Sequence, residues 1–194
     1  MAAQEGNEIT VRVVCTKEEL ISFFAEKGFT EKERFSLWDS YFVPECLELP
    51  SLSAREILSK AVLVRQIFDG AVYHKKLTYK IKEFNAAGEI LRQKAVNCDI
   101  CDIAAGKALL KAMGYEELMQ IREDDIVYQK DGLELAVKDV TGGDLLIEAE
   151  TASGTAYDTI PKLKAAVAAL QIPIQPNEYF VKKAEIALEK ALLK

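Results

Sequence analysis

The sequence has few of the features that mark specialised classes of protein. Only 5 of its 194 residues are proline, and its single histidine, His74, lies close to the Asp69-Gly70 turn and has no expected catalytic role. No hydrophobic run is long enough to span a membrane, and residues 1–10 lack the pattern of a signal peptide. We therefore expect one cytoplasmic domain over residues 1–194 that does not bind membranes.

An excess of positive charge is also missing. The net charge is −6, which argues against a broad surface for binding nucleic acid. It does not exclude a local basic pocket, because net charge says nothing about how charges are arranged. The hydrophobic fraction of 49% and the charged fraction of 29% are ordinary for a soluble globular protein.

Cysteine is scarce, with four residues in the chain. Cys98 and Cys101 form a CxxC motif, but a structural zinc site needs a second pair at similar spacing, which Cys15 and Cys46 do not supply. A thioredoxin-like role stays open, since such a pair lies where a strand turns into a helix. Two small, partly buried residues at a turn are the more common explanation.

Hydrophobic periodicity predicts about eight strands and four helices. Expected strands span residues 7–14, 33–43, 61–68, 73–82, 89–97, 117–129, 133–140 and 144–151. Expected helices span residues 16–28, 102–113, 155–170 and 177–194, with a helical turn at 53–59. The turns Asp69-Gly70 and Asp131-Gly132 indicate hairpins, and hence a mostly antiparallel sheet in an α+β fold.

Charged residues segregate by strand in this pattern. Strands in the middle of the chain carry residues such as Arg65 and Lys80, whereas the first and last strands carry Glu8, Glu148 and Glu150. A half-exposed open sheet explains each strand separately, but ordinary surfaces mix both signs locally. Eight antiparallel strands can close into a barrel whose charged faces point inward and whose helices pack outside. A lumen rich in Arg and Lys is costly to leave empty and suits a polyanion, with a divalent cation between the phosphates and the carboxylates.

Several short motifs occur in the order seen in one protein family. They are Glu8-Ile-Thr10-Val-Arg12 for ExExK, Leu63-Val-Arg65 for LRIR, Leu77-Thr-Tyr-Lys80 for LTYK, Arg92-Gln-Lys94 for a basic pair, Gln120-Ile-Arg122 for KxR, and Asp139 followed by Glu148-Ala-Glu150 for Asp then ExE. In these features the chain resembles the CYTH superfamily, the triphosphate tunnel metalloenzymes. The resemblance covers nearly the whole chain, and the LTYK and ExE matches are its most specific parts.

The resemblance implies a closed eight-stranded tunnel that binds a triphosphate or nucleotide together with Mg²⁺ or Mn²⁺. By this comparison the metal ligands are Glu8, Asp139, Glu148 and Glu150, and the substrate-binding residues are Arg12, Arg65, Lys80, Arg92, Lys94 and Arg122. The residues implied for catalysis are Glu148, Glu150 and Lys80. Strand parity allows only one of Lys138 and Asp139 to face the lumen, and the resemblance favours Asp139.

The chain also departs from the family pattern. Thr10 and Lys94 stand where the family has acids, and Leu63 and Gln120 stand where it has bases. The leading hypothesis is a metal-dependent hydrolase of a triphosphate-containing small molecule. A class IV adenylyl cyclase that makes cyclic AMP from ATP is the first alternative, and a non-catalytic tunnel that binds a phosphorylated ligand is the second. A homodimer stays open, because the sequence does not reveal the oligomeric state.

Overall fold

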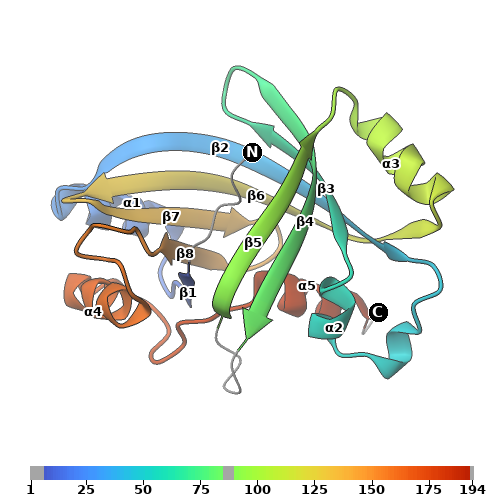
Figure 1. Cartoon of the computed structure of the whole chain (residues 1–194). Helices are drawn as coiled ribbons and strands as arrows, with labels where there is room; N and C mark the ends of the chain where they lie inside the picture. The colour runs from blue at the N-terminus through green and yellow to red at the C-terminus, as the bar shows by residue number, and fades with distance from the viewer. Residues whose placement is uncertain (1–6, 85–89, 193–194) are drawn as a thin grey trace.

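The computed structural model describes residues 7–84 and 90–192 and contains one eight-stranded antiparallel sheet (Figure 1). The strands are β1 (Glu8–Arg12), β2 (Thr30–Pro44), β3 (Val62–Phe68), β4 (Tyr73–Phe84), β5 (Ile90–Asp99), β6 (Tyr115–Lys130), β7 (Leu133–Val140) and β8 (Leu145–Glu150). The helices are α1 (Lys17–Glu26), α2 (Ala54–Leu58), α3 (Ile103–Ala112), α4 (Ile160–Leu170) and α5 (Lys183–Leu192), with a short 3₁₀ turn at Leu49–Ser51. The α+β class is confirmed.

Local sequence signals account for where many elements begin and turn. The Thr16 side chain accepts a hydrogen bond from the Glu19 amide, and the Glu19 carboxylate accepts one from the Thr16 amide, which completes the capping box that starts α1. Asp131 and Gly132 both have positive φ, at 49° and 80°, as a tight β6–β7 hairpin requires. The two hairpins predicted from Asp-Gly turns are therefore present.

The sheet is strongly curved, but a closed barrel is not confirmed. Its strand order is β1-β8-β7-β6-β2-β3-β4-β5, and no ladder within the described ranges joins β1 to β5. Instead, the chain that follows α4 covers the free edge of β1. The Thr10 amide donates to the Tyr179 carbonyl, and the Val181 amide donates to the Thr10 carbonyl, each at 3.0 Å. This pairing satisfies backbone hydrogen-bonding groups at the edge of β1 and brings the start of α5 to the concave side of the sheet.

The convex face of the sheet carries the largest hydrophobic core. Phe24 of α1 and Leu163 of α4 are fully buried against Val11, Leu135 and Ile147 on β1, β7 and β8. Helices therefore cover the apolar face of these strands, as expected, and the alternate residues point to the concave side. On that concave side Leu188 of α5 packs with Ile57 of α2, which closes one end of the sheet (Figure 1).

Two helices start later than the sequence pattern indicated. Helix α4 begins at Ile160 with Pro161 in its first turn, a position where proline costs no hydrogen bond. Helix α5 begins at Lys183 rather than at Asn177, because residues 179–181 run extended beside β1. None of the helices in the described ranges is both long and apolar enough to cross a membrane.

Candidate functional site

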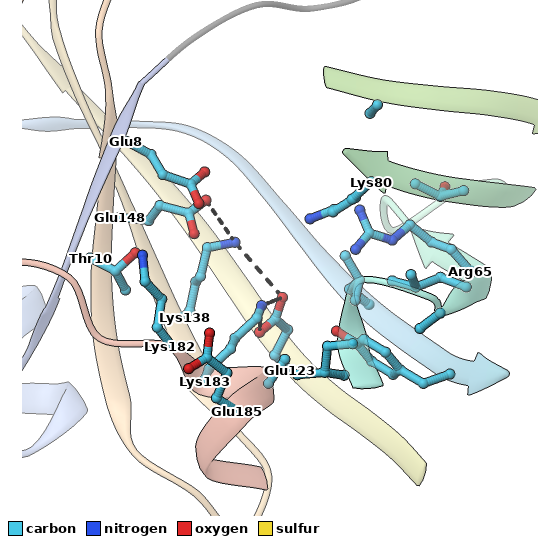
Figure 2. Close-up of a pocket in the computed structure, with 18 of the residues that line it drawn as sticks. Glu8, Thr10, Arg65, Lys80, Glu123, Lys138, Glu148, Lys182, Lys183 and Glu185 are labelled. Atoms are coloured by element: carbon cyan, nitrogen blue, oxygen red, sulfur yellow. Dashed lines mark hydrogen bonds and ion pairs between the residues drawn. The ribbon is translucent and has the colours of Figure 1, made fainter. Parts of the chain in front are cut away.

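The concave face encloses a cavity of about 360 Å³, which is within the size range of small-molecule sites. Strands β1 and β8 form one wall, β3 and β4 form the opposite wall, and the start of α5 lies between them (Figure 2). Among the described side chains, the cations that line it are Arg55, Arg65, Lys76, Lys80, Lys138, Lys182 and Lys183. The carboxylates are Glu8, Glu123, Glu148, Glu150 and Glu185.

Three carboxylates form an acidic wall. Glu8 and Glu150 are direct cross-strand partners, and Glu148 is the partner of Thr10. One carboxylate oxygen of Glu8, Glu148 and Glu150 can be chosen so that all three lie within 4.8 Å of one another. Desolvation raises the pKa of Glu150, and the charges of Glu148 and Glu8 raise it further. The wall therefore concentrates negative charge in a way that suits a divalent cation.

The opposite wall is basic. Arg65 of β3 and Lys76 of β4 are cross-strand partners, and Lys80 follows along β4. Arg65 donates from Nε and Nη2 to the two carboxylate oxygens of Asp39, at 2.7 and 2.6 Å. Burial opposes the charge of Arg65, but Asp39, only 2% exposed, holds the pKa of this guanidinium above its ordinary value. Arg65 is thus charged and fixed in orientation.

Between the two walls, buried ion pairs form the floor of the cavity. The Lys138 ammonium lies 3.0 Å from Asp125, 3.4 Å from Glu148 and 3.7 Å from Glu123. Lys183, at the start of α5, donates to both carboxylate oxygens of Glu123 (Figure 2). Although burial disfavours its charge, Lys138 has its pKa held above the ordinary value by these carboxylates. Lys138 is therefore a permanent cation at the floor.

The structure brings five of the predicted site residues together in the cavity: Glu8, Arg65, Lys80, Glu148 and Glu150. They come from β1, β3, β4 and β8, so residues up to about 140 positions apart meet at one site. The inward direction predicted for Glu148 and Glu150 is correct, since Ile147 and Ala149 between them are in the convex core. Their chemical roles stay predictions.

Asp139 does not line the cavity, and the preference for it over Lys138 was wrong. Its carboxylate accepts a hydrogen bond from Lys17 at 2.8 Å, outside the cavity. Along β7, Asp139 has the parity of the core residues Leu135 and Val137, and Lys138 has the opposite parity. The family pattern therefore pointed to a residue that the strand directs away from the site.

Arg12, Lys94 and Arg122 also lie outside the cavity lining. Arg12, at the end of β1, donates to Glu178 at 2.9 Å and lies 3.2 Å from Asp144. Lys94 and Arg122 are exposed, and the residues that face the cavity are their neighbours on β5 and β6. Arg92 lies outside the residues whose side chains the structure describes.

Sequence reasoning missed other residues of the site. Asp39 is a lone acid in the apolar run Ser-Leu-Trp-Asp-Ser-Tyr-Phe-Val, and this isolation could have marked it as a buried partner for a cation. Glu123 and Asp125 are buried at 2% and 0% exposure but alternate with exposed charged residues, so polarity alone did not reveal their face. Lys183 carried no local signal, because tertiary packing alone brings α5 to the cavity.

Comparison with known proteins shows that solved structures share this fold. No family model and no curated protein sequence matches the chain. The PH1819 protein from Pyrococcus horikoshii superposes with a TM-score of 0.70 at 20% identity, covering 96% of this chain and 99% of that one. HpAC1 from Hippeastrum, a candidate adenylyl cyclase described as having a dominant triphosphatase activity, gives 0.61 at 17% identity over 96% of each chain. The chain has the fold of these proteins. At 20% and 17% identity the likeness shows a shared fold and no more.

The same fold also occurs in a very different setting. A chain of the Schizosaccharomyces pombe Mediator head module gives a TM-score of 0.61 at 9% identity, covering 92% of this chain and 99% of that one. A shared fold at such low identity does not carry an activity with it. Function must therefore be argued from the residues in the cavity.

Proposed function

We propose that the chain is a divalent-cation-dependent hydrolase of a triphosphate-containing small molecule. The observation that carries this proposal is the cavity itself, where Glu8, Glu148 and Glu150 face Arg65, Lys76 and Lys80. A phosphate chain needs cationic side chains along its oxygens, and a cluster of carboxylates beside it is tolerable only with a metal ion between them. The opposed walls meet both requirements.

Glu8, Glu148 and Glu150 would hold Mg²⁺ or Mn²⁺. They fit such an ion because all three ligands are hard oxygen donors within 4.8 Å of one another, and their mutual repulsion would be relieved. When bound, a divalent cation supplies charge neutralisation and polarises phosphoryl oxygens. HpAC1, with its described triphosphatase activity, supports the same class of substrate.

The basic wall would position the phosphate chain of the substrate. Asp39 holds Arg65 through Nε and Nη2, so the guanidinium plane is fixed before a ligand arrives. Lys76 and Lys80 would present mobile point charges to the phosphate oxygens, and Lys182, the residue before α5, lies beside Thr10 (Figure 2). Lys80 would stabilise the negative charge that develops as the terminal phosphoryl group is transferred to water.

One observation favours a second candidate, a non-catalytic site for a phosphorylated ligand. The cations Arg65, Lys138 and Lys183 are each paired with a buried carboxylate, namely Asp39, Asp125 and Glu123. These pairs leave the three cations less able to stabilise the negative charge that develops during phosphoryl transfer, although a ligand can still bind.

A single set of assays separates these functions. The purified chain is incubated with tripolyphosphate, ATP or thiamine triphosphate in Mg²⁺ or Mn²⁺, and released phosphate and cyclic AMP are measured. Phosphate release that disappears with EDTA supports the hydrolase, whereas cyclic AMP from ATP supports a class IV adenylyl cyclase. Absence of both products, with a ligand-dependent rise in Tm, supports the binding site.

A further inference from the structure

One cavity residue is placed among carboxylates in the way that a metal ion would be. Lys138 is 8% exposed, and β7 holds it between β6, which carries Glu123 and Asp125, and β8, which carries Glu148. Its ammonium lies 3.0, 3.4 and 3.7 Å from Asp125, Glu148 and Glu123 (Figure 2). Lys138 therefore connects the acidic wall to the acids of the floor.

These contacts surround the ammonium group with negative charge. A lysine has three N–H donors and no acceptor, and three carboxylates surround this one. The hydrogen bond to Asp125 and the negative charges of Glu148 and Glu123 hold the ammonium among the acids, so we do not count Lys138 in the phosphate-binding set. Its fixed positive charge would repel a divalent cation placed between Glu123 and Asp125, because it already offsets the attraction of those two acids.

We propose that the Lys138 ammonium is a built-in cation that takes the place of a divalent ion among Glu123, Asp125 and Glu148, so that the chain binds one divalent cation, at Glu8, Glu148 and Glu150. This inference rests on the cation site of the proposed function. Two neighbouring residues also reduce the negative charge available to a further divalent cation. Thr10 stands opposite Glu148 with no carboxylate, and Lys183 donates to both carboxylate oxygens of Glu123.

The test is a count of Mn²⁺ ions per chain in the presence of a non-hydrolysable imidotriphosphate. Electron paramagnetic resonance of free Mn²⁺ during a titration gives this count directly. We expect one ion per wild-type chain and two per chain in Lys138→Met, which leaves Glu123, Asp125 and Glu148 without their shared cation. Two ions or none on the wild-type chain would overturn the proposal, and so would a single ion on folded Lys138→Met.

A matched control is Lys17→Met, because Lys17 pairs with Asp139 on the other side of β7. We expect it to keep one ion per chain. If Lys138→Met does not fold without metal, the double variant Lys138→Met with Asp125→Asn removes one buried charge and keeps an oxygen ligand at that position. It is expected to bind two ions, and one ion on this variant would count against the proposal.

The count involves no turnover, so it separates this inference from the proposed function. An inactive chain that binds one Mn²⁺ would contradict the hydrolase and support the role of Lys138. An active wild-type chain that binds two ions would support the hydrolase and contradict the role of Lys138.

Discussion

At the scale of single residues, the acidic wall gives the most direct test of the proposed function. Replacing Glu148 and Glu150 together by Gln removes two of three clustered carboxylates while keeping the shape of the side chains. We expect phosphate release to fall by more than about a hundredfold, since even outer-shell changes at metal sites cost about 10- to 100-fold. The fold should persist, as judged by circular dichroism and Tm. The matched control is Asp139→Asn, which lies outside the cavity and should retain its activity.

The raised pKa of Glu150 predicts how stability depends on pH. Its carboxyl group binds a proton more tightly in the folded chain than at its ordinary value of 4.5, because of desolvation and the charges of Glu148 and Glu8. Without divalent cations, its contribution to the free energy of unfolding is therefore favourable at low pH. It decreases as pH rises from about 4.5 through the higher, folded pKa.

Urea unfolding of the wild type and of Glu150→Gln at several pH values measures this contribution as a difference. We expect the variant to become relatively more stable as pH rises through that window and to reach a plateau above it. Burial raises the pKa of Asp125 to about 6 as well, but that effect is common to both proteins and cancels. A constant difference at all pH values would contradict the prediction.

The basic wall is tested by one lysine inside the cavity and one outside it. Lys80→Ala should weaken binding of imidotriphosphate about tenfold or more, because hydrogen bonds to charged groups contribute about 1.5–3 kcal/mol. The salt dependence of binding should also become shallower. Lys94→Ala, on the outer face of β5, should bind as the wild type does, and calorimetry measures both. Equal losses in the two variants would mean that Lys80 acts only through net charge.

At the scale of elements, α5 is a part of the site that depends on packing. Leu188 is fully buried among residues of the cluster that includes Tyr41, Ile57 and Leu63, and this contact positions the helix that carries Lys183. Leu188→Ala should lower the free energy of unfolding by about 2–5 kcal/mol and weaken ligand binding at the same time. Leu192→Ala is the control on the same helix, because Leu192 is 52% exposed. Chemical denaturation would show whether the two leucines differ as expected.

The strands and hairpins were easier to predict than the tertiary contacts between them. Alternation in the sequence located all eight strands, and the Asp-Gly turns identified two hairpins, because both signals are local. The start of α5 was placed several residues too early because backbone pairing with Thr10 holds residues 179–181 extended. For β7 the two-residue period indicated only that Lys138 and Asp139 face opposite sides, and the family pattern led to the wrong choice of Asp139. For β6 both faces carry charge, so no local signal separated Glu123 from Arg122.

At the scale of the whole molecule, the cavity is close to electrically neutral. Seven cations and five carboxylates line it among the described residues, and buried Asp39 and Asp125 lie against two of those cations. A free polyanion gains little from such a site, whereas a polyanion with its cation fits both walls. Binding of Mg²⁺ and of imidotriphosphate should therefore strengthen each other.

We expect each ligand to raise the affinity for the other by about 5- to 150-fold, the usual range of coupling between sites. Calorimetric titrations of each ligand in the presence and absence of the other measure this factor twice, and the two values must agree. Sodium chloride at matched ionic strength is the control. Independent binding of the two ligands would show that the acidic and basic walls do not form one site.

The sequence by itself determined the strands, the hairpins and the inward direction of Glu148 and Glu150, because the pleat of a strand and the geometry of a turn are set by nearby residues. Only the tertiary structure decided that β1 pairs with the chain after α4, that Lys183 reaches Glu123, and that Lys138 is surrounded by carboxylates from β6 and β8. These contacts join residues far apart in the chain. They depend on how strongly the sheet curves and where α5 packs, and no local pattern encodes either of these.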